Sequence, residues 1–585
     1  MTKKSFYKKL LITNAFMASL LTVVSCSTKK SLNWQGKEFY QEYNKLSYKD
    51  DDKNVQFIAP FYSKNNEKSS TIYQLLVYAF ADGNNDGIGD FIGLKNNLNY
   101  FVDLGIDQLY LSPIHPASSY HGYDVINYTD VAPELGGKQA FIEFLQEAHS
   151  KGIKIYLDLV FNHTSFEHPW FLKALEGDEK YKNFYRFYEN QIQDTNQDTD
   201  QLRNLFPNLK NKKGTNKWYT SKFWAGMPDL NLDNPEVIQE LKYIQSYWTK
   251  LGVDGFRYDA FVEYFSSKNE TKNNYNENKI FSELREASIQ GLQSINRNLD
   301  IFMMGEWWDS PLSAKKYFYD GQKLALGTVY DGKHWKNNFF FLNFKHDQLK
   351  TFLNNLGSEK QHLWIPFLTN HDVDRWINSF RKAVEQEDDL SKNLSDRAKL
   401  AVKNAYFFLL SMPGNPIIYH GDELYMHSSQ SKGDSFMREP FKWKNKDLQV
   451  NFKEEKSPND HIHLNYSSDI DYVEDQVNNP SSTFNLIKFM NNFRKKHPFM
   501  YLQDSKTIAD ANEFVKNPDY RVLVRQNIEQ TEQYLFIFSA GLGKKTNYKL
   551  KENVKAEIVY SENVELKNNE INLNEMGFAI LKVTN

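Results

Sequence analysis

The chain has 585 residues, of which 40% are hydrophobic and 25% charged, which excludes a disordered or fibrous protein and predicts two or three globular domains. Its formal net charge of −3 excludes the strongly basic surface that is typical of nucleic-acid-binding proteins, so no nucleic-acid partner is expected. The oligomeric state remains open.

The first 26 residues are typical of a secretion signal. Four lysines stand before residue 10, and the apolar run that follows to residue 24 is too short to span a bilayer comfortably. Cys26, the only cysteine, ends this run in a setting that resembles the lipobox of bacterial lipoproteins, in which the cysteine is acylated. We therefore expect residues 1–26 to be a lipoprotein signal peptide with lipidated Cys26, residues 27–54 to be a polar tether, and the protein to be secreted and held at the bacterial cell surface through a lipid anchor in a membrane.

From residue 55 onward, apolar runs of strand length alternate with stretches of helix length. The strand-like runs are Ile72–Phe80, Ile106–Leu111, Ile153–Val160, Val253–Tyr258, Ile301–Met304, a weaker Leu326–Tyr330, His362–Leu368 and Pro416–Tyr419. The clearest helical stretches are Gly137–Lys151, Asn234–Leu251, Lys279–Arg297 and Ser395–Leu410. This alternation predicts an α/β fold with parallel strands and right-handed crossovers, and eight strands would close a (β/α)8 TIM barrel.

Two segments depart from this alternation. Residues 164–228 show no clear strand–helix unit, and because long structureless connections are uncommon, we expect a small inserted domain there. The barrel would then comprise residues 55–163 and 229–500. Short alternating runs at Tyr520–Arg525, Gln533–Ser539, Ala556–Tyr560 and Gly577–Val583 predict a C-terminal all-β domain, a β-sandwich, over residues 501–585.

Polar and ionisable residues gather where four of the predicted strands end. The four strings are Asp158 to His163, Gly255 to Asp259, Gly305-Glu306 and Asn370-His371-Asp372. In a barrel, the C-terminal ends of the strands face one cavity, where catalytic groups collect. One Asp after a strand is more often a helix cap than a catalyst, but four strings at four strand ends predict an active site.

Together these strings closely resemble the conserved regions of the α-amylase superfamily, glycoside hydrolase family 13, over roughly residues 55–585. The resemblance implies a retaining enzyme with Asp259 as nucleophile, Glu306 as acid and then base, and Asp372 as a stabiliser of the transition state. Retaining hydrolysis requires such a pair of carboxyl groups. Arg257 lies two residues before Asp259, points to the same side of the strand and is expected to keep the nucleophile ionised, with Asp158 as its structural partner.

The resemblance also implies which residues hold the sugar ring. His163 and His371 are expected to donate hydrogen bonds to it, and Tyr123, with His121 beside it, is expected to stack on the sugar at the cleavage point. A further string, Met227-Pro228-Asp229-Leu230-Asn231, resembles a region of the subgroup between α-amylases and oligo-1,6-glucosidases. Read without the resemblance, that string is a turn followed by a helix cap.

A loop after the first predicted strand has the composition of a Ca²⁺ site. Oxygen ligands stand at alternate positions, at Asp82, Asn84, Asp86 and Asp90, with the backbone carbonyl of Ile88. The twelfth position is Gly93 rather than Glu, which excludes an EF-hand, and an Asx-rich turn without metal is the alternative. Similar loops bind Ca²⁺ in family members. A second family site uses Asn162, but the usual His is replaced by Glu263, which leaves that site open.

The leading interpretation is an endo-acting α-amylase or neopullulanase-like enzyme that hydrolyses α-1,4 bonds of starch, glycogen or maltooligosaccharides. Exo-acting family members carry an Asp three residues before the stacking Tyr, where it pairs with an Arg and closes the cleft. That position is Tyr120 here, so Arg438 is expected to lack its carboxylate partner. The alternatives are an oligo-1,6-glucosidase or other exo-α-glucosidase, a 4-α-glucanotransferase and, in another class, a non-catalytic glucan-binding protein, which typically loses one of the carboxylates.

Overall fold

The structure is a computed structural model that describes most of the chain in eight segments. These are residues 43–57, 71–188, 218–265, 275–333, 346–357, 364–451, 471–539 and 545–584, together with the backbone of short strands at β1 (Ser31–Leu32), β2 (Glu38–Phe39) and β7 (Leu202–Asn204). The predicted signal peptide and Cys26 lie outside the described residues. Within the described part, no helix has both the length and the apolar character needed to cross a membrane.

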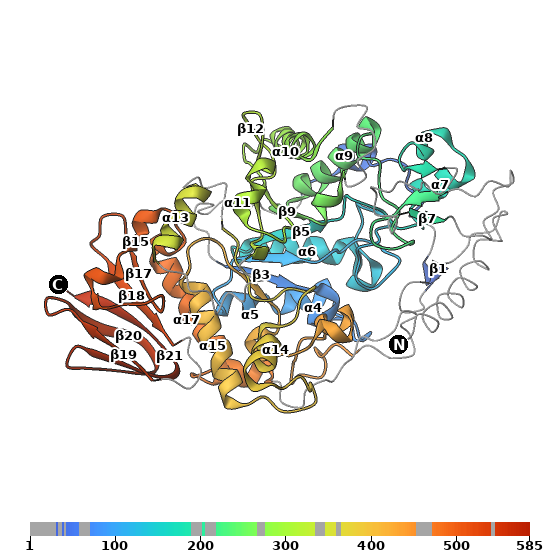
Figure 1. Cartoon of the computed structure of the whole chain (residues 1–585). Coiled ribbons are helices and arrows are strands. Elements are labelled where there is room, and N and C mark those ends of the chain that lie inside the picture. Colours follow the sequence, from blue (N-terminus) through green and yellow to red (C-terminus); the bar gives the residue numbers. More distant parts are fainter. Residues whose placement is uncertain are drawn as a thin grey trace.

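The centre of the molecule is a parallel sheet that curls into a closed barrel (Figure 1). Its strands follow the order β13-β10-β9-β5-β4-β3-β14, with bounds β3 Ile72–Leu75, β4 Gln108–Leu111, β5 Lys154–Leu159, β9 Gly255–Tyr258, β10 Phe302–Gly305, β13 Thr328–Val329 and β14 Ile417–Tyr419. The segment around residues 364–368 closes the ring through parallel bridges from Ile365 to Tyr330 and from Phe367 to Ile417. The predicted TIM barrel is therefore confirmed.

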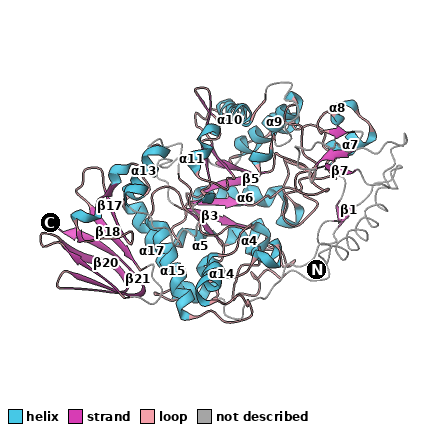
Figure 2. Ribbon diagram, viewed as in Figure 1, coloured by secondary structure: helices cyan, strands magenta, loops and turns pink. Residues whose placement is uncertain are grey.

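Helices surround this barrel, as Figure 2 shows. The longer ones are α6 (Gly137–Ser150), α9 (Pro235–Leu251), α10 (Glu277–Ser294), α13 (His346–Leu356), α15 (Asp396–Ser411) and α17 (Thr483–Lys496). The shorter ones are α4 (Phe91–Asn96), α5 (Leu98–Asp103), α11 (Pro311–Ala314), α14 (Trp376–Phe380) and α16 (Val473–Asn478), and a small hairpin pairs β11 (Tyr319–Asp320) with β12 (Lys323–Leu324). The four helices named from the sequence are present to within a few residues at each end.

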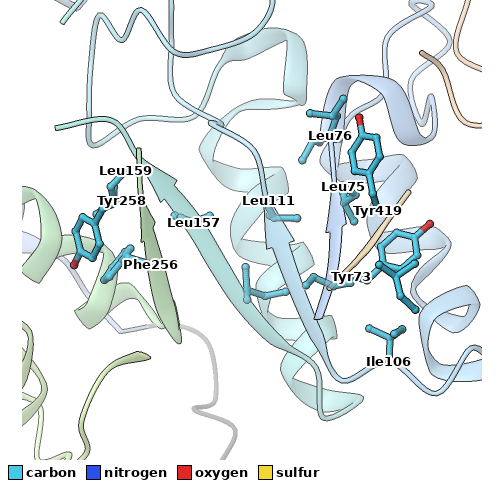
Figure 3. Close-up of a cluster of buried hydrophobic side chains, with 14 of the residues drawn as sticks. Tyr73, Leu75, Leu76, Ile106, Leu111, Leu157, Leu159, Phe256, Tyr258 and Tyr419 are labelled. Atoms are coloured by element: carbon cyan, nitrogen blue, oxygen red, sulfur yellow. The ribbon is translucent and has the colours of Figure 1, made fainter. Parts of the chain in front are cut away.

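Side chains along the barrel strands alternate between two apolar layers. One set points outward to the helices, and Figure 3 shows part of it, with Leu111, Leu157 and Tyr258 among the residues drawn. The other set fills the barrel interior and includes Tyr110 and Tyr156. Because successive side chains in a strand face opposite sides, each strand has fixed inward positions, and these determine which polar residues reach the cavity at the strand ends.

The first predicted strand is too long. Ile72–Phe80 was expected as one strand, but β3 ends at Leu75 and α3 (Val77–Phe80) follows as a short buried helix. Every residue of both elements is buried. A continuous apolar run lacks the periodicity that separates a buried strand from a buried helical turn, which is the reason for the error.

The connection between β5 and α9 carries the predicted insert. It contains α7 (Pro169–Glu176), α8 (Glu179–Lys182) and an antiparallel sheet in which β8 (Trp218–Thr220) lies between β6 (Phe187–Tyr188) and β7. Antiparallel bridges from His163 to Asp229 and from Tyr185 to Leu230 bring the two ends of the insert together at the barrel.

The predicted tether does not extend to residue 54. The backbone carbonyl of Leu46 accepts hydrogen bonds from Trp170 and Tyr181 of the insert, at 3.1 Å each, and Tyr48 is fully buried. The segment then forms α2 (Lys49–Asn54) and packs along α9, where the backbone N–H of Tyr48 donates to Glu240 at 2.7 Å. Polar composition suggested a solvated linker, but a single large aromatic residue anchors this segment in the body of the protein.

The C-terminal region is an antiparallel sheet at the opposite end of the barrel from the insert (Figure 1). Its strands are β15 (Ile508–Ala509), β16 (Val515–Lys516), β17 (Val522–Gln526), β18 (Gln533–Phe538), β19 (Thr546–Leu550), β20 (Lys555–Lys567) and β21 (Glu570–Thr584). Long β21 pairs with β18, β19 and β20 in turn. The predicted all-β domain is confirmed, although β15, β16 and β19 were missed and β20 and β21 are longer than the sequence pattern indicated.

Candidate functional site

Strand register brings the polar residues of three neighbouring strands to one point inside the barrel. Asp158 in β5 lies opposite Arg257 in β9, and Arg257 lies opposite Met304 in β10. All three occupy inward positions, because Tyr156 and Met304 belong to the interior layer. Asp259 and Glu306 each stand two residues beyond an inward residue, so strand alternation directs both carboxyl groups into the same cavity.

Arg257 is the centre of this cluster. Its Nη1 lies 2.9 Å from both oxygens of Asp158 and 2.7 Å from Oδ1 of Asp259, and its Nη2 lies 3.1 Å from Oε2 of Glu306. Its Nε donates to the hydroxyl of Tyr330 at 2.9 Å. The guanidinium is fully buried, so one cation serves three carboxyl groups.

Asp259 does not form the simple ion pair with Arg257 that the sequence predicts, because Arg257 is shared with two other carboxyl groups. Burial raises the pKa of Asp259 well above its usual range; Arg257 opposes this shift, while the negative charges of Glu306 and Asp158 add to it. Burial also raises the pKa of Asp158. Because one guanidinium balances only one carboxylate, the buried cluster as a whole favours retention of a proton.

Glu306 is held by donors on both oxygens. The backbone N–H of Ala260 donates to Oε2 at 2.7 Å, and Nε1 of Trp308 donates to Oε1 at 2.9 Å. Ala260 has φ of 45°, in the left-handed region that residues with a Cβ seldom adopt. The turn after β9 thus accepts backbone strain and aims this N–H at the carboxylate.

A second cluster lies beside the first and contains the predicted sugar-binding residues. The Tyr123 and His371 rings are nearly parallel, with centroids 5.6 Å apart, and the Tyr123 hydroxyl lies 2.5 Å from His371 Nε2 and 3.1 Å from Asp158. Asp372 Oδ2 lies 3.0 Å from the same Nε2, and Gln74 contacts Nδ1 at 2.7 Å. Burial lowers the pKa of His371 well below its usual value, so the neutral ring is favoured.

The other two predicted histidines are engaged by the protein itself. His163 contacts the carbonyl of Tyr123 through Nε2 at 3.0 Å and the Asn162 amide through Nδ1 at 3.3 Å, and burial lowers its pKa to about 4. His121 contacts Ser119 at 2.7 Å and accepts from the Tyr123 N–H at 3.1 Å. Both rings therefore position Tyr123, and their contact with sugar remains a prediction.

Arg438 does have a carboxylate partner, contrary to expectation. Its Nη2 lies 2.9 Å from Oδ1 of Asp372, and its Nε donates to the His371 carbonyl at 3.3 Å. Tyr120 occupies the position of the missing Asp, and its ring packs edge-on against Tyr78 at 5.7 Å. The arginine is thus tied to the predicted transition-state stabiliser.

The loop at residues 82–90 is built of Asx turns. Asp82 accepts from the N–H groups of Asn84, Asn85 and Gly87, Asn84 from that of Asp86, and Asp86 from that of Ile88, at 2.7 to 3.1 Å. Burial raises the pKa of Asp90 to about 6, and the charges of Asp82 and Asp86 add to that shift. A buried carboxyl group whose pKa is raised further by two neighbouring carboxylates suits a cation.

The described residues nevertheless contain no group of three or more His, Cys, Asp or Glu side chains arranged to hold a metal ion. A cation at the 82–90 loop would therefore also need the amide oxygen of Asn84 and the carbonyl of Ile88, which matches the predicted donor set. At the position of the second family site, Asn162 donates to Asp229 at 3.1 Å, and Glu263 pairs with Lys222 at 3.3 Å.

Three contributors to the site were missed from the sequence: Gln74, Tyr110 and Tyr330. Each forms a hydrogen bond with a predicted residue, namely His371, Asp158 and Arg257 in that order. Gln74 could have been found, because a Gln inside an otherwise apolar buried strand requires a polar partner. The contacts of Tyr110 and Tyr330 depend on the register and the turns of neighbouring strands, which sequence patterns do not indicate.

Comparison with known proteins identifies relatives of the whole catalytic region. The alpha-amylase catalytic-domain family matches residues 74–503. Alpha-amylase 3 of Dictyoglomus thermophilum is 33% identical over 388 residues, covering 64% of this chain and 68% of the relative. The 4-alpha-glucanotransferase of Thermotoga neapolitana is 32% identical over 375 residues, covering 63% of this chain and 75% of the relative. The crystal structure of an alpha-amylase from H. orenii superposes with a TM-score of 0.68 at 25% identity, covering 88% of this chain and 100% of that one.

Proposed function

The chain belongs to the α-amylase family of α-glucan-active enzymes, and from that premise we propose that it is an endo-acting α-amylase that cleaves internal α-1,4 bonds with retention of configuration. The observation that carries the proposal is the Arg257 cluster, in which one guanidinium contacts the two carboxyl groups that a retaining mechanism requires. All three catalytic carboxylates of the family pattern are present, which argues against a non-catalytic glucan-binding protein.

The proposed reaction has two steps. In the first, Asp259 attacks the anomeric carbon while Glu306 gives its proton to the leaving oxygen, so that a glycosyl ester replaces the glycosidic bond. In the second, the Glu306 carboxylate takes a proton from water, whose oxygen displaces Asp259. Asp372 and the polar face of the His371–Tyr123 pair surround the sugar ring that carries the developing positive charge.

Endo cleavage is supported by the surroundings of Tyr120. In an exo-acting relative an Asp at this position would pair with the arginine and close the cleft, whereas here Arg438 is bound to Asp372 and Tyr120 provides no carboxylate. Burial raises the pKa of Tyr120, with Arg438 opposing that shift, so the phenol remains neutral at ordinary pH. A neutral aromatic residue leaves the cleft open to a continuing chain.

The test is a time course of products from starch, pullulan and isomaltose. We expect starch to lose viscosity and iodine staining early and to release maltooligosaccharides of mixed length. If glucose is the sole early product while viscosity persists, the enzyme is exo-acting, and rapid cleavage of isomaltose would instead indicate an oligo-1,6-glucosidase.

A 4-α-glucanotransferase is the second candidate, because the relative from Thermotoga neapolitana carries that name and matches this chain at 32% identity. The two activities share every catalytic residue. Incubation with maltotriose separates them, since a transferase redistributes glucose units without changing the number of reducing ends, whereas a hydrolase adds one reducing end for every bond that it cleaves.

We also propose that the enzyme is anchored at the cell surface through lipidated Cys26, a residue outside the described part of the chain. The support is the lone cysteine at the end of the N-terminal apolar run. A Cys26→Ala variant is expected to keep its activity and to leave the membrane fraction, and its retention in washed membranes would contradict the anchor.

A further inference from the structure

Two arginine–carboxylate pairs join the same two segments of the chain, one pair at the cleft and one in the interior. At the cleft, Arg438 binds Asp372, with 2.9 Å between Nη2 and Oδ1. In the interior, Arg375 faces Glu439, with 3.8 Å between Nε and Oε1. Asp372 and Arg375 belong to one segment, and Arg438 and Glu439 are consecutive residues of the other. Each segment therefore contributes one cation and one anion, and the two pairs run in opposite directions between them.

The interior pair is fixed to the barrel. Nη1 of Arg375 donates to the His420 carbonyl at 3.0 Å and to Oδ1 of Asp422 at 2.7 Å, directly after β14. The guanidinium also lies over the Tyr419 ring, with 4.8 Å between Cζ and the ring centroid. The hydroxyl of the same tyrosine donates to the Met437 carbonyl at 2.6 Å. The end of β14 therefore holds both segments at once.

The carboxyl group of Glu439 depends mainly on Arg375 for its charge balance. Glu439 is only 4% exposed, so its charge requires a partner within the protein. Burial raises the pKa of Glu439, and Arg375 opposes this shift more strongly than Lys442 does. If Glu439 loses its charge, Arg375 still has Asp422 as a buried partner. Removal of this carboxylate therefore breaks the tie between the two segments without leaving an unbalanced buried cation.

We propose that Glu439 is a positioning residue for the reaction: its pair with Arg375 fixes the neighbouring Arg438 and thereby the direction of the Asp372 carboxylate. The proposal rests on the proposed cleavage of α-glucans, in which Asp372 stabilises the positive charge that develops on the sugar ring. Arg438 also donates from Nε to the His371 carbonyl at 3.3 Å, so a shift of its backbone would move two groups of the site. A carboxylate stabilises a transition state best when it is held in the productive direction before the reaction begins.

Loss of this positioning should lower turnover rather than substrate binding. Glu439→Gln removes the charge and keeps the shape of the side chain. We expect its kcat for maltoheptaose to fall about tenfold, because misplacement of a group by about 1 Å can cost about a hundredfold. KM should stay within about twofold, since the lost interaction is made mainly in the transition state. Arg375→Lys should show the same pattern, because a single ammonium group cannot replace the fork of a guanidinium.

A double-mutant cycle with Asp372→Asn separates positioning from a structural defect. The cycle is followed with α-maltosyl fluoride, from which fluoride leaves without an acid, so that slow variants remain measurable. With Asp372 present, Glu439→Gln should lower kcat about tenfold. With Asp372→Asn already in place, the same substitution should lower kcat by less than about twofold, because the residue through which Glu439 acts is gone. A tenfold loss in both backgrounds would overturn the positioning role.

Glu240→Gln is the matched control, because Glu240 is also buried, on α9, where the backbone N–H of Tyr48 donates to it. Its kcat should stay within about twofold of wild type on both substrates, and thermal unfolding checks that every variant is folded. Unchanged kcat in folded Glu439→Gln and Arg375→Lys would overturn the positioning role and leave the proposed function intact. A wild type that cleaves neither substrate would contradict the proposed function and this role together.

Discussion

Arg257 shows how one residue organises the chemistry of this site. Its guanidinium lies against Asp158, Asp259 and Glu306, all within 3.1 Å. The spacing of Arg257 and Asp259 on one strand was sufficient to predict their contact, because residues two apart point the same way. The contact with Glu306 was not predictable from spacing, since it depends on the register between β9 and β10.

At the residue scale, His168 is a buried group whose titration affects stability. Its Nδ1 accepts from the Trp170 N–H at 3.1 Å, its Nε2 lies 3.2 Å from the Tyr48 hydroxyl, and burial lowers its pKa to about 3. The folded state thus binds this proton far more weakly than the unfolded state, whose His titrates near 6.5. The resulting stability is fully present above pH 6.5 and is lost as pH falls toward 3.

We predict that the free energy of unfolding of wild type falls between pH 7 and pH 5 by about 2 kcal/mol more than that of His168→Asn. The reason is that, below pH 6.5, each pH unit removes about 1.4 kcal/mol of the stability that His168 contributes. Asn keeps an oxygen that caps α7 but does not titrate. Urea denaturation of both proteins at the two pH values measures the difference. Parallel losses in the two proteins would show that His168 does not titrate in this way.

At the element scale, the accuracy of prediction followed the kind of pattern. Amphipathic helices such as α6 and α9 were located to within a residue or two, because their apolar periodicity is explicit. The all-apolar run at β3 and α3 was misread, and the polar segment ending at Asn54 was taken for a linker although Tyr48 anchors it. Both errors concern segments whose partners are distant in sequence: Glu240 lies 192 residues from Tyr48.

The loop between α3 and α4 gives a second prediction, which concerns Ca²⁺. We propose that Asp82, Asn84, Asp86, Asp90 and the Ile88 carbonyl hold this ion and brace the rim of the barrel. A ligand that binds only the folded state stabilises it by mass action. Excess chelator should therefore lower the Tm of wild type by several degrees, with little effect on activity at low temperature.

Asp86→Ala should have a lowered Tm that no longer responds to chelator or to added Ca²⁺. Asp434→Ala, which changes an exposed carboxylate outside the loop, should respond to chelator as wild type does. An unchanged wild-type Tm in excess chelator would contradict a structural calcium.

At the scale of the whole molecule, two buried arginines bind carbonyls around the end of α15, and one of them, Arg525, joins the barrel to the C-terminal sheet. Arg525 of β17 donates to the carbonyls of Ser411, Phe499 and Met500 at 2.7 to 3.0 Å, and Arg494 of α17 donates to those of Leu410, Met412 and Gly414 at 2.6 to 2.8 Å. Several of these carbonyls lie at the C-terminal end of α15, where the helix dipole favours a positive charge. Burial lowers the pKa of both arginines to about 9.

We predict that Arg525→Met lowers the free energy of unfolding by about 3 kcal/mol, because buried carbonyls lose their donors. Arg521→Met, four residues earlier at a more exposed pair with Asp519, should cost about 1 kcal/mol or less. Thermal unfolding checks the comparison, and initial rates at low temperature should match wild type in both variants. Equal effects of the two substitutions would contradict a structural role for the buried arginine.

The architecture as a whole was accessible from the sequence, since the barrel and the C-terminal sheet each carry their own periodicity and the insert interrupts that of the barrel. The closure of the ring and the pairing of Arg438 with Asp372 were not, because they depend on the relative placement of distant loops. The central claim to test is the assignment of Asp259 as nucleophile and Glu306 as acid.

Azide rescue with α-maltosyl fluoride tests that assignment directly. In Glu306→Ala, Asp259 still forms the glycosyl ester, because fluoride leaves without an acid, and azide then displaces the ester to give α-maltosyl azide with net retention. In Asp259→Ala, azide attacks from the vacated face and gives β-maltosyl azide by a single inversion. NMR assignment of the anomer in each variant decides the matter: α from Glu306→Ala with β from Asp259→Ala is the predicted result, and the reverse pattern, or the same anomer from both variants, would contradict it.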